Sequence, residues 1–283
     1  MKKKWSENDM EFIKNTYPNF GSEYCAKQLN RTQNSIRYIV RELGLKMTDK
    51  GIKRTFEASS AKRLQNTTHK VDENLFIKNY TKHSAYILGL LWADGYIQQR
   101  GVITLSCVKE DMLSFKKILE TCGSWTYYES KRGNTKTQIS AITVNKKLTN
   151  FLIQHNYRSK TLFPTIVNKI PKKLQLYFFR GLIDGDGCFY ENKKNKCYQF
   201  SLTSGHEQDW SFITTILNNR NIKYQVNKRI VITRENKENK SSSIRINSKK
   251  EIKKLGEYIY KNFNEDSCGL ERKHNKFISI TQK

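Results

Sequence analysis

Two aspartates, each placed at the end of a short apolar segment and followed by glycine, are the residues of this 283-residue chain best suited to chemistry. Asp94 is the last residue but one of the segment YILGLLWADG, and Asp186 has the same place in FFRGLIDGDG, 92 positions later (186 − 94). Small residues recur four positions apart in both segments, which places them on one helix face where two backbones can approach closely. Two such helices packed together would bring the carboxylates to one end of their interface. Close carboxylates on a very basic protein indicate a divalent metal and a phosphate-rich substrate.

The segments that follow the two motifs also match each other, which indicates an internal duplication. Residues 105–115 align with residues 202–212 without a gap, at an offset of 97 (202 − 105). Residues 142–152 then match residues 244–255 at an offset of 102 (244 − 142). The apolar periodicity of each copy predicts a helix, a strand pair, a second helix, a second strand pair and a third helix.

The two motifs and the order of elements resemble the LAGLIDADG homing endonucleases, in the single-chain form that carries both motifs. The resemblance covers about residues 81–283 and includes the lead-in SKTLFP at residues 159–164. It implies an α+β fold in which tandem pseudo-symmetric αββαββα repeats, residues 81–165 and 166–283, form a saddle. It also implies a monomer that makes a double-strand cut in double-stranded DNA at a long asymmetric site, with Mg²⁺ or Mn²⁺ as cofactor.

Asp94 and Asp186 are therefore the candidate catalytic residues and metal ligands. The alternative is that each is a simple turn residue, but the helix dipole disfavours a carboxylate at a C-terminus, so two at equivalent positions argue for function. The carbonyls just before them, those of Ala93 and Gly185, would be auxiliary ligands. The resemblance further implies basic residues beside the acids, for which the candidates are Lys109, Lys146 and, in the second repeat, Lys249 or Lys250. Any one of these lysines could instead be a surface charge.

Residues 1–46 are predicted to form a separate all-α unit of three short helices. Ser6 and Asp9 can form a capping box before the first helix, Ser22 can begin the second, and Thr32 can cap the third, which ends at Gly44. The third helix is expected to expose side chains of types that contact base edges and phosphates; these are Arg31, Gln33, Asn34, Arg37 and Arg41. The pattern resembles a helix-turn-helix DNA-binding module, and a small helical cap with a solvated basic face is the alternative. Residues 47–80 are polar and basic with little periodicity, which predicts a linker along DNA or a flexible tether.

Composition agrees with a nucleic-acid partner. The chain has 52 Lys and Arg against 26 Asp and Glu, a net charge of +26 spread along its length, which suits a polyanion. No apolar run reaches membrane length and no signal-peptide core follows the basic start, so we expect no membrane partner and a cytoplasmic or organellar location. Two other functions share the fold and the charge: a non-cleaving DNA-binding transcription regulator and an RNA-splicing maturase. Both aspartates are present, and this favours the endonuclease.

Overall fold

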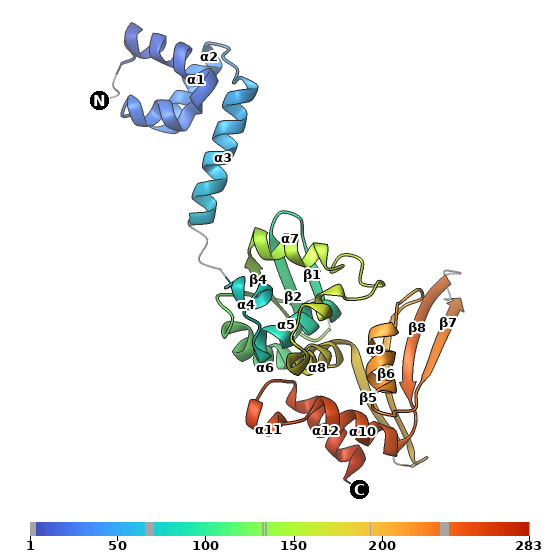
Figure 1. Ribbon diagram of the computed structural model, residues 1–283. Helices are drawn as coiled ribbons and strands as arrows, with labels where there is room; N and C mark the ends of the chain where they lie inside the picture. The colour runs from blue at the N-terminus through green and yellow to red at the C-terminus, as the bar shows by residue number, and fades with distance from the viewer. Residues whose placement is uncertain are drawn as a thin grey trace. The chain divides into compact units, whose positions relative to one another are not determined.

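The computed structural model describes residues 4–65, 71–131, 133, 135–192, 194–232 and 238–282 (Figure 1). The chain divides into two compact units, residues 1–67 and 68–283. Each unit has a hydrophobic core of its own. Among the described helices, none combines the length and apolar character that a bilayer span requires.

The first unit is all-helical, with α1 (Glu7–Gln28), α2 (Gln33–Glu42) and α3 (Asp49–Gln65). The predicted capping box of Ser6 and Asp9 begins α1. This helix is broken at Gly21, whose φ of 75° is left-handed, so its two parts are the first two predicted helices. Thr32 caps α2, as predicted, and Gly44, with φ 60°, follows its last turn.

The helix α3 occupies much of the segment expected to be a linker. Its start is held against α1, because the Thr48 amide donates to the Pro18 carbonyl at 2.9 Å. A Cβ on Gly51 would lie 2.2 Å from the same carbonyl oxygen, so the two backbones touch. The Arg54 guanidinium also lies over the Phe20 ring, 4.3 Å from its centroid. Because the contact uses backbone atoms and a cation, α3 has no apolar stripe that the sequence could reveal. Residues 66–70 of the expected linker lie outside the described residues.

The second unit starts with α4 (Asn74–Ile77) and then contains one arrangement twice. The first copy consists of α5 (Lys82–Ala93), β1 (Gly95–Ile97), β2 (Val102–Val108), α6 (Lys109–Glu120), β3 (Thr126–Ser130), β4 (Gln138–Val144) and α7 (Lys146–Gln154). The second consists of α8 (Gln175–Asp186), β5 (Gly187–Asn192), β6 (Cys197–Gly205), α9 (Ser211–Asn218), β7 (Gln225–Ile232), β8 (Glu238–Ile246) and α10 (Lys249–Ile259). Two short 3₁₀ helices, Thr165–Asn168 and Lys172–Leu174, join the copies, and α11 (Phe263–Asp266) and α12 (Glu271–Thr281) follow the second.

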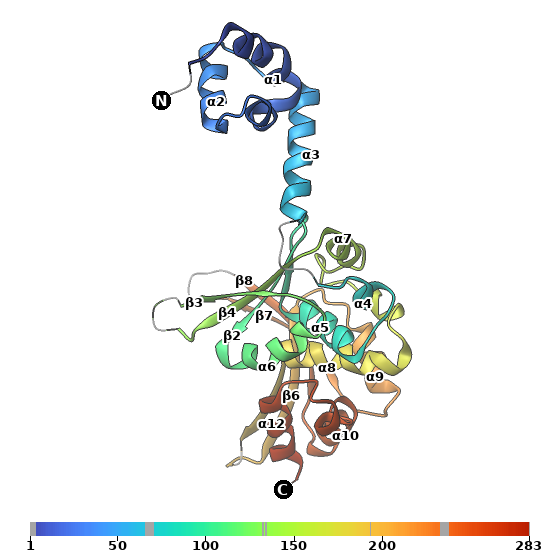
Figure 2. The same ribbon diagram turned by 90° about the vertical axis from the view of Figure 1, so that its left-hand side faces the viewer.

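Each copy folds into a four-stranded antiparallel sheet with the same strand order. The orders are β1-β2-β4-β3 and β5-β6-β8-β7. The predicted α+β class and the αββαββα repeat are thus confirmed. In both views α5 and α8 lie side by side in the second unit (Figures 1 and 2).

The strand register corrects the alignment of the repeats by one residue. Leu105 pairs with Ala141, and its equivalent Leu202 pairs with Ile244, so the offset in the last strand is 103 (244 − 141). All four of these side chains are buried, which fixes them on the helix-covered face of each sheet. Aligning Ile142 with Ile244 matched residue types but not faces, because a shift of one position moves a side chain to the other face of a strand.

The helix caps give the same corrected offset. Asn145 is the N-cap of α7 and Ser248 is the N-cap of α10, again 103 positions apart (248 − 145). The structural equivalent of Ile142 is therefore Arg245, and that of Lys146 is Lys249.

The two copies are joined through a backbone contact between α5 and α8. A Cβ on Gly89 would lie 2.0 Å from the Phe178 carbonyl oxygen, and a Cβ on Gly181 would lie 2.1 Å from the Tyr86 carbonyl oxygen. Each glycine thus admits the other helix at a position where any side chain would collide. The predicted face of small residues is the contact face.

Polar residues that occur only in α8 anchor the C-terminal segment. Asp184 accepts hydrogen bonds from the Tyr86 hydroxyl at 2.7 Å and from the Leu270 amide at 2.8 Å. Arg180, which is fully buried, donates to three main-chain carbonyls, those of Ile259, Lys261 and Cys268. Leu88 and Trp92 occupy the equivalent positions of α5, so this anchorage belongs to the second copy.

Replacement of Gly89 or Gly181 by alanine should destabilise the second unit by about 3 kcal/mol or more, at or above the usual cost of overpacking a core. The reason is that the new methyl group would meet a main-chain oxygen that cannot move without separating the helices. Urea unfolding of the full chain measures this. Gly205→Ala is the control, since its methyl would meet only Thr161 Cγ2 at 3.2 Å. Equal stability of all three variants would contradict the close contact.

Candidate active site

Asp94 and Asp186 lie together at the end of the α5–α8 interface. Asp94 is the C-cap of α5, and Asp186 is the last residue of α8. A Cβ on Gly185 would lie 2.3 Å from Ala93 Cβ and 3.1 Å from Asp94 Oδ2. The residues just before the two acids are therefore where the helices touch, and the missing side chain of Gly185 leaves room for the Asp94 carboxylate.

The two carboxyl groups share a partly buried environment that disfavours negative charge. Burial raises the pKa of Asp186 to about 6, and the nearby charge of Asp94 contributes to the rise. Burial also raises the pKa of Asp94 above its ordinary value. Lys160 and Lys273 act in the opposite direction on both acids. The site thus holds two acids and two ammonium groups.

Lys160 lies against the end of α5, beside Asp94. Its ammonium group donates to the carbonyl of Ala93 at 3.0 Å and to that of Gly95 at 2.6 Å. Burial lowers the pKa of Lys160 to about 8, and the charges of Asp186 and Asp94 limit this fall. Lys160 belongs to the segment SKTLFP that leads into the second copy.

Lys273, on α12, has the equivalent place at the end of α8. Its buried ammonium group donates to four carbonyls, those of Ile183, Asp184, Gly185 and Gly187, at 2.6 to 3.1 Å. Gly185 and Gly187 correspond to Ala93 and Gly95, at the motif offset of 92. Each lysine therefore satisfies the last carbonyls of one helix and offsets the negative end of its dipole, where an aspartate would otherwise be disfavoured.

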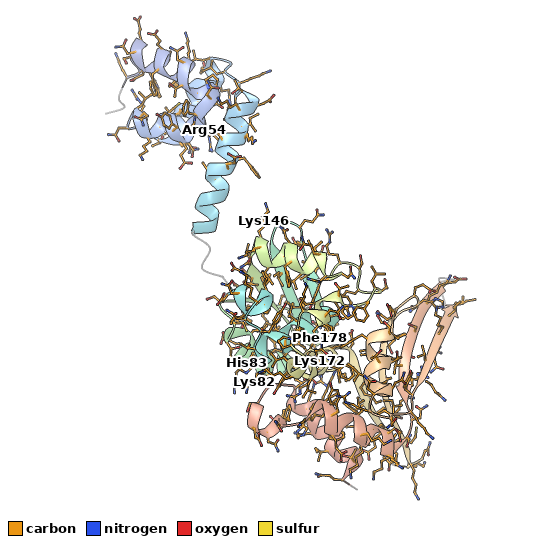
Figure 3. All side chains as sticks on the ribbon, in the orientation of Figure 1. Arg54, Lys82, His83, Lys146, Lys172 and Phe178 are labelled. Atoms are coloured by element: carbon orange, nitrogen blue, oxygen red, sulfur yellow. The ribbon has the colours of Figure 1, made fainter. Side chains whose placement is uncertain are left out.

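The structure does not bring Lys146 or Lys250 to the carboxylates. Gly95 pairs with Leu105, whereas Val144, just before α7, pairs with Val102. Lys146 follows at the opposite end of β2, roughly 20 Å from Asp94 along the strands at about 3.3 Å per residue. Figure 3 shows it at the edge of its unit, away from Phe178 on α8.

The other predicted lysines are equally remote or are engaged on the surface. Lys250 follows β8, whose last residue, Ile246, pairs with Phe200 away from the acid, and its neighbour Lys249 shares that location. Lys109 begins α6 and donates to Glu129 at 3.1 Å, with both side chains about half exposed.

The two lysines that do converge on the acids differ in how far the sequence could have revealed them. Lys160 lies in the lead-in segment, whose position between the copies could have singled it out. Lys273 lies in α12, which has no counterpart in the first copy, so no alignment of the repeats could identify it among 52 basic residues.

A hard divalent cation fits the donor set. No group of three or more His, Cys, Asp or Glu gathers anywhere in the described part of the chain, so the two aspartates would be the only charged protein ligands. Mg²⁺ commonly takes one or two carboxylates and completes its shell with waters and substrate phosphate oxygens. The carbonyls of Ala93 and Gly185 accept lysine hydrogen bonds, and each oxygen has a second lone pair.

A small pocket opens beside Asp186, at the junction with the second sheet. Lys160, Ser204 and Gln208 line it with polar groups. The Ser204 hydroxyl donates to Gln208 Oε1 at 2.6 Å, and the Gln208 amide nitrogen donates to the main-chain carbonyls of Thr161 and Asp209. The pocket therefore offers polar partners for water or a phosphate oxygen near one carboxylate.

In the first unit, the expectation that Arg31 is exposed is wrong. Its side chain is only 9 % exposed and donates to Asp9 at 2.9 Å, while the guanidinium stacks on Trp5. Gln33 is half-buried and donates to Ser22 at 3.1 Å. Asn34, Arg37 and Arg41 are exposed on α2, as predicted, and Tyr38 is exposed beside them.

A family model matches the second copy of the arrangement. Residues 173–260 match the family model described as "LAGLIDADG-like domain". No curated protein matches the chain. Among solved structures, the homing endonuclease I-WcaI bound to its DNA recognition sequence is 19 % identical, with a TM-score of 0.43, covering 71 % of this chain and 90 % of its own.

Two further solved structures have similar scores. The I-SmaMI LAGLIDADG homing endonuclease bound to cleaved DNA is 10 % identical, with a TM-score of 0.42, covering 70 % of this chain and 87 % of its own. Full-length DUF199/WhiA from Thermatoga maritima is 14 % identical, with a TM-score of 0.42. The match covers 71 % of this chain and 60 % of the WhiA chain. Residues 173–260 are therefore a LAGLIDADG-like domain, and the first copy has the same helix, the same strand order and an equivalent aspartate.

Proposed function

We propose that this protein is a site-specific DNA endonuclease that makes a metal-dependent double-strand cut at a long asymmetric site. The observation that carries the proposal is the pair Asp94 and Asp186, brought together by two packed helices with one lysine docked beside each acid. Two equivalent centres suit a substrate with two strands to cut.

Phosphodiester hydrolysis needs a metal or an equivalent charge, and a bound Mg²⁺ would activate water and stabilise charge on the scissile phosphate. Asp94 and Asp186 would hold such an ion. Lys160 and Lys273 keep a positive charge at the Nζ atom beside each acid, where it attracts the phosphate and compensates charge that develops on it. By donating to the carbonyls around each acid, they also fix the carboxylate positions.

The sheet faces opposite the helices supply a surface for the bases. Side chains that alternate with the buried core residues lie on these open faces, and most are neutral and polar or aromatic. On the first sheet they include Tyr96, Thr104, Ser106, Tyr128 and Ser140, and on the second Tyr190, Ser201, Asn227, Arg229 and Arg245. Hydrogen-bonding side chains of this kind read base edges in the major groove. Because the two faces differ, the site is asymmetric.

The first unit would bind DNA through α2, as a helix-turn-helix module. The proposal rests on the exposed face of Asn34, Arg37, Tyr38 and Arg41, which combines phosphate-binding and base-contacting groups. This unit adds affinity and length of site without chemistry.

Asp94→Asn and Asp186→Asn should each lower double-strand cleavage by roughly a thousandfold, because loss of a charged ligand removes several kcal/mol of metal-dependent stabilisation. Specific DNA binding should remain, since affinity comes mainly from the many Lys and Arg contacts. Cleavage of the flanking DNA of its own gene with Mg²⁺ or Mn²⁺ measures the first effect, and a mobility-shift titration the second.

Two results would overturn the nuclease assignment. Specific binding without any metal-dependent cleavage by the parent protein would identify a DNA-binding regulator. Specific binding to the transcript of that DNA, with no duplex cleavage, would identify an RNA-splicing maturase.

Lys160→Met and Lys273→Met should each slow single-turnover cleavage by about a hundredfold, the usual effect of removing one preorganised charge donor. Lys146→Met is the matched control, because it removes the same charge far from the acids, and it should cut normally. Urea unfolding shows whether Lys273→Met, which leaves four carbonyls without their donor, is also destabilised. If Lys146→Met slowed cleavage as much as Lys160→Met or Lys273→Met, the catalytic role would belong to Lys146, as the resemblance implied.

Combined replacement of Arg37 and Arg41 by alanine should weaken DNA binding and make it less sensitive to salt. The logarithmic slope of affinity against salt concentration should fall by about 0.9 for each phosphate that is no longer neutralised. The protected footprint should shorten at one end only, and cleavage at saturating enzyme should persist. Lys14→Ala with Lys27→Ala, on α1, removes the same charge as a control. An unchanged footprint would make this unit a structural cap.

A further inference from the structure

Arg245 is a cation on the open face of the second sheet, near the end of the inner strand β8. It lies on β8 between Ser201 of β6 and Gln225 of β7. Its Nε atom is buried and has no hydrogen-bond partner in the structure. Within the described residues, no carboxylate pairs with the guanidinium. The side chain as a whole is partly exposed, and an unmade hydrogen bond to a buried donor is costly, so the guanidinium is suited to turn toward an acceptor from a bound molecule.

The polar neighbours of Arg245 are already engaged with one another. Gln199 donates to Asn247 at 2.9 Å, and Asn247 donates to Gln225 at 3.4 Å. These amides hold the surroundings of Arg245 in place without supplying it with an acceptor. The arginine is thus a donor group without a carboxylate partner among the described residues, on a face that also carries Arg229.

The equivalent position of the first sheet has opposite chemistry. Ile142 of β4 lies between Thr104 of β2 and Thr126 of β3, and the corrected offset of 103 makes it the counterpart of Arg245. Methyl-bearing side chains therefore stand on one half where a forked donor stands on the other. The duplication kept the strand and its register but changed what this position can recognise.

The position of Arg245 along its strand places it near the acids. Gly187, which follows Asp186, pairs with Leu202, and Ser201, the strand partner of Arg245, is the adjacent residue. A base contacted by Arg245 would therefore lie in the part of its half-site close to the cut, not at the outer end.

Resting on the proposed function, we propose that Arg245 selects a guanine in the inner part of the second half-site and that Ile142 selects thymine at the mirrored position. Arginine makes a bidentate contact with guanine O6 and N7, which an aliphatic side chain cannot make. Aliphatic side chains instead contact the thymine methyl group. The pair of residues makes this step of the recognition asymmetric.

The test selects bound duplexes from a randomised DNA pool with the full-length protein and compares the base preferences of variants. Arg245→Gln should reduce discrimination for guanine about tenfold to a hundredfold at one inner position, corresponding to a bidentate contact, and leave other positions unchanged. Ile142→Arg should create a guanine preference at the mirrored position. Lys228→Gln is the control, because it removes one positive charge from the same sheet on the opposite face.

The outcomes separate this inference from the proposed function. Selection needs binding but no cleavage, so a protein that selects a sequence and does not cut would refute the nuclease and leave the Arg245 assignment standing. An unchanged preference in Arg245→Gln, or an equal loss of affinity for all sequences, would make Arg245 a non-specific contact and overturn the inference. Circular dichroism and thermal unfolding confirm that each variant is folded, and Ile142→Arg supplies a gain that misfolding cannot imitate.

Discussion

The second unit depends on one steric constraint: two helix backbones must touch. Gly89 and Gly181 each face a carbonyl of the opposite helix at a distance that excludes any side chain. Because α5 and α8 are apolar and almost completely buried, this contact sits at the centre of a core that extends into both sheets. The same contact sets the spacing of everything at the ends of the helices, including the two aspartates.

Placing a carboxylate at the negative end of a helix creates a second constraint, which the chain meets with lysines brought from elsewhere. Lys160 comes from the connection between the copies, and Lys273 comes from the C-terminal helix α12. Each neutralises the end of one helix while leaving the acid available. The two lysines thus stabilise the aspartates at the helix C-termini and also give the site its positive charge. Both the stability of the fold and the proposed chemistry therefore depend on these two side chains.

The two copies have diverged where symmetry is not needed. α8 carries Arg180 and Asp184, which hold the C-terminal segment, and α12 reaches the first copy through a bidentate ion pair from Arg272 to Asp111. The open sheet faces differ as well, as Ile142 and Arg245 illustrate. A single chain allows this divergence because each half meets its own part of the ligand, whereas identical subunits would present identical surfaces.

The sequence alone determined the features that rest on local periodicity and residue size: the motif helices, their small-residue face, the strand and helix order, the caps of the first unit and the proximity of Asp94 and Asp186. It did not determine α3, whose contact with α1 uses backbone atoms and leaves no apolar pattern. It also placed the repeats one residue out of register in the last strand, since similarity of residue type does not reveal which face a side chain takes. Only the tertiary structure decided which lysines meet the acids, because Lys160 and Lys273 reach them from segments distant in the chain, while Arg31, basic by sequence, is turned inward by Asp9 and Trp5.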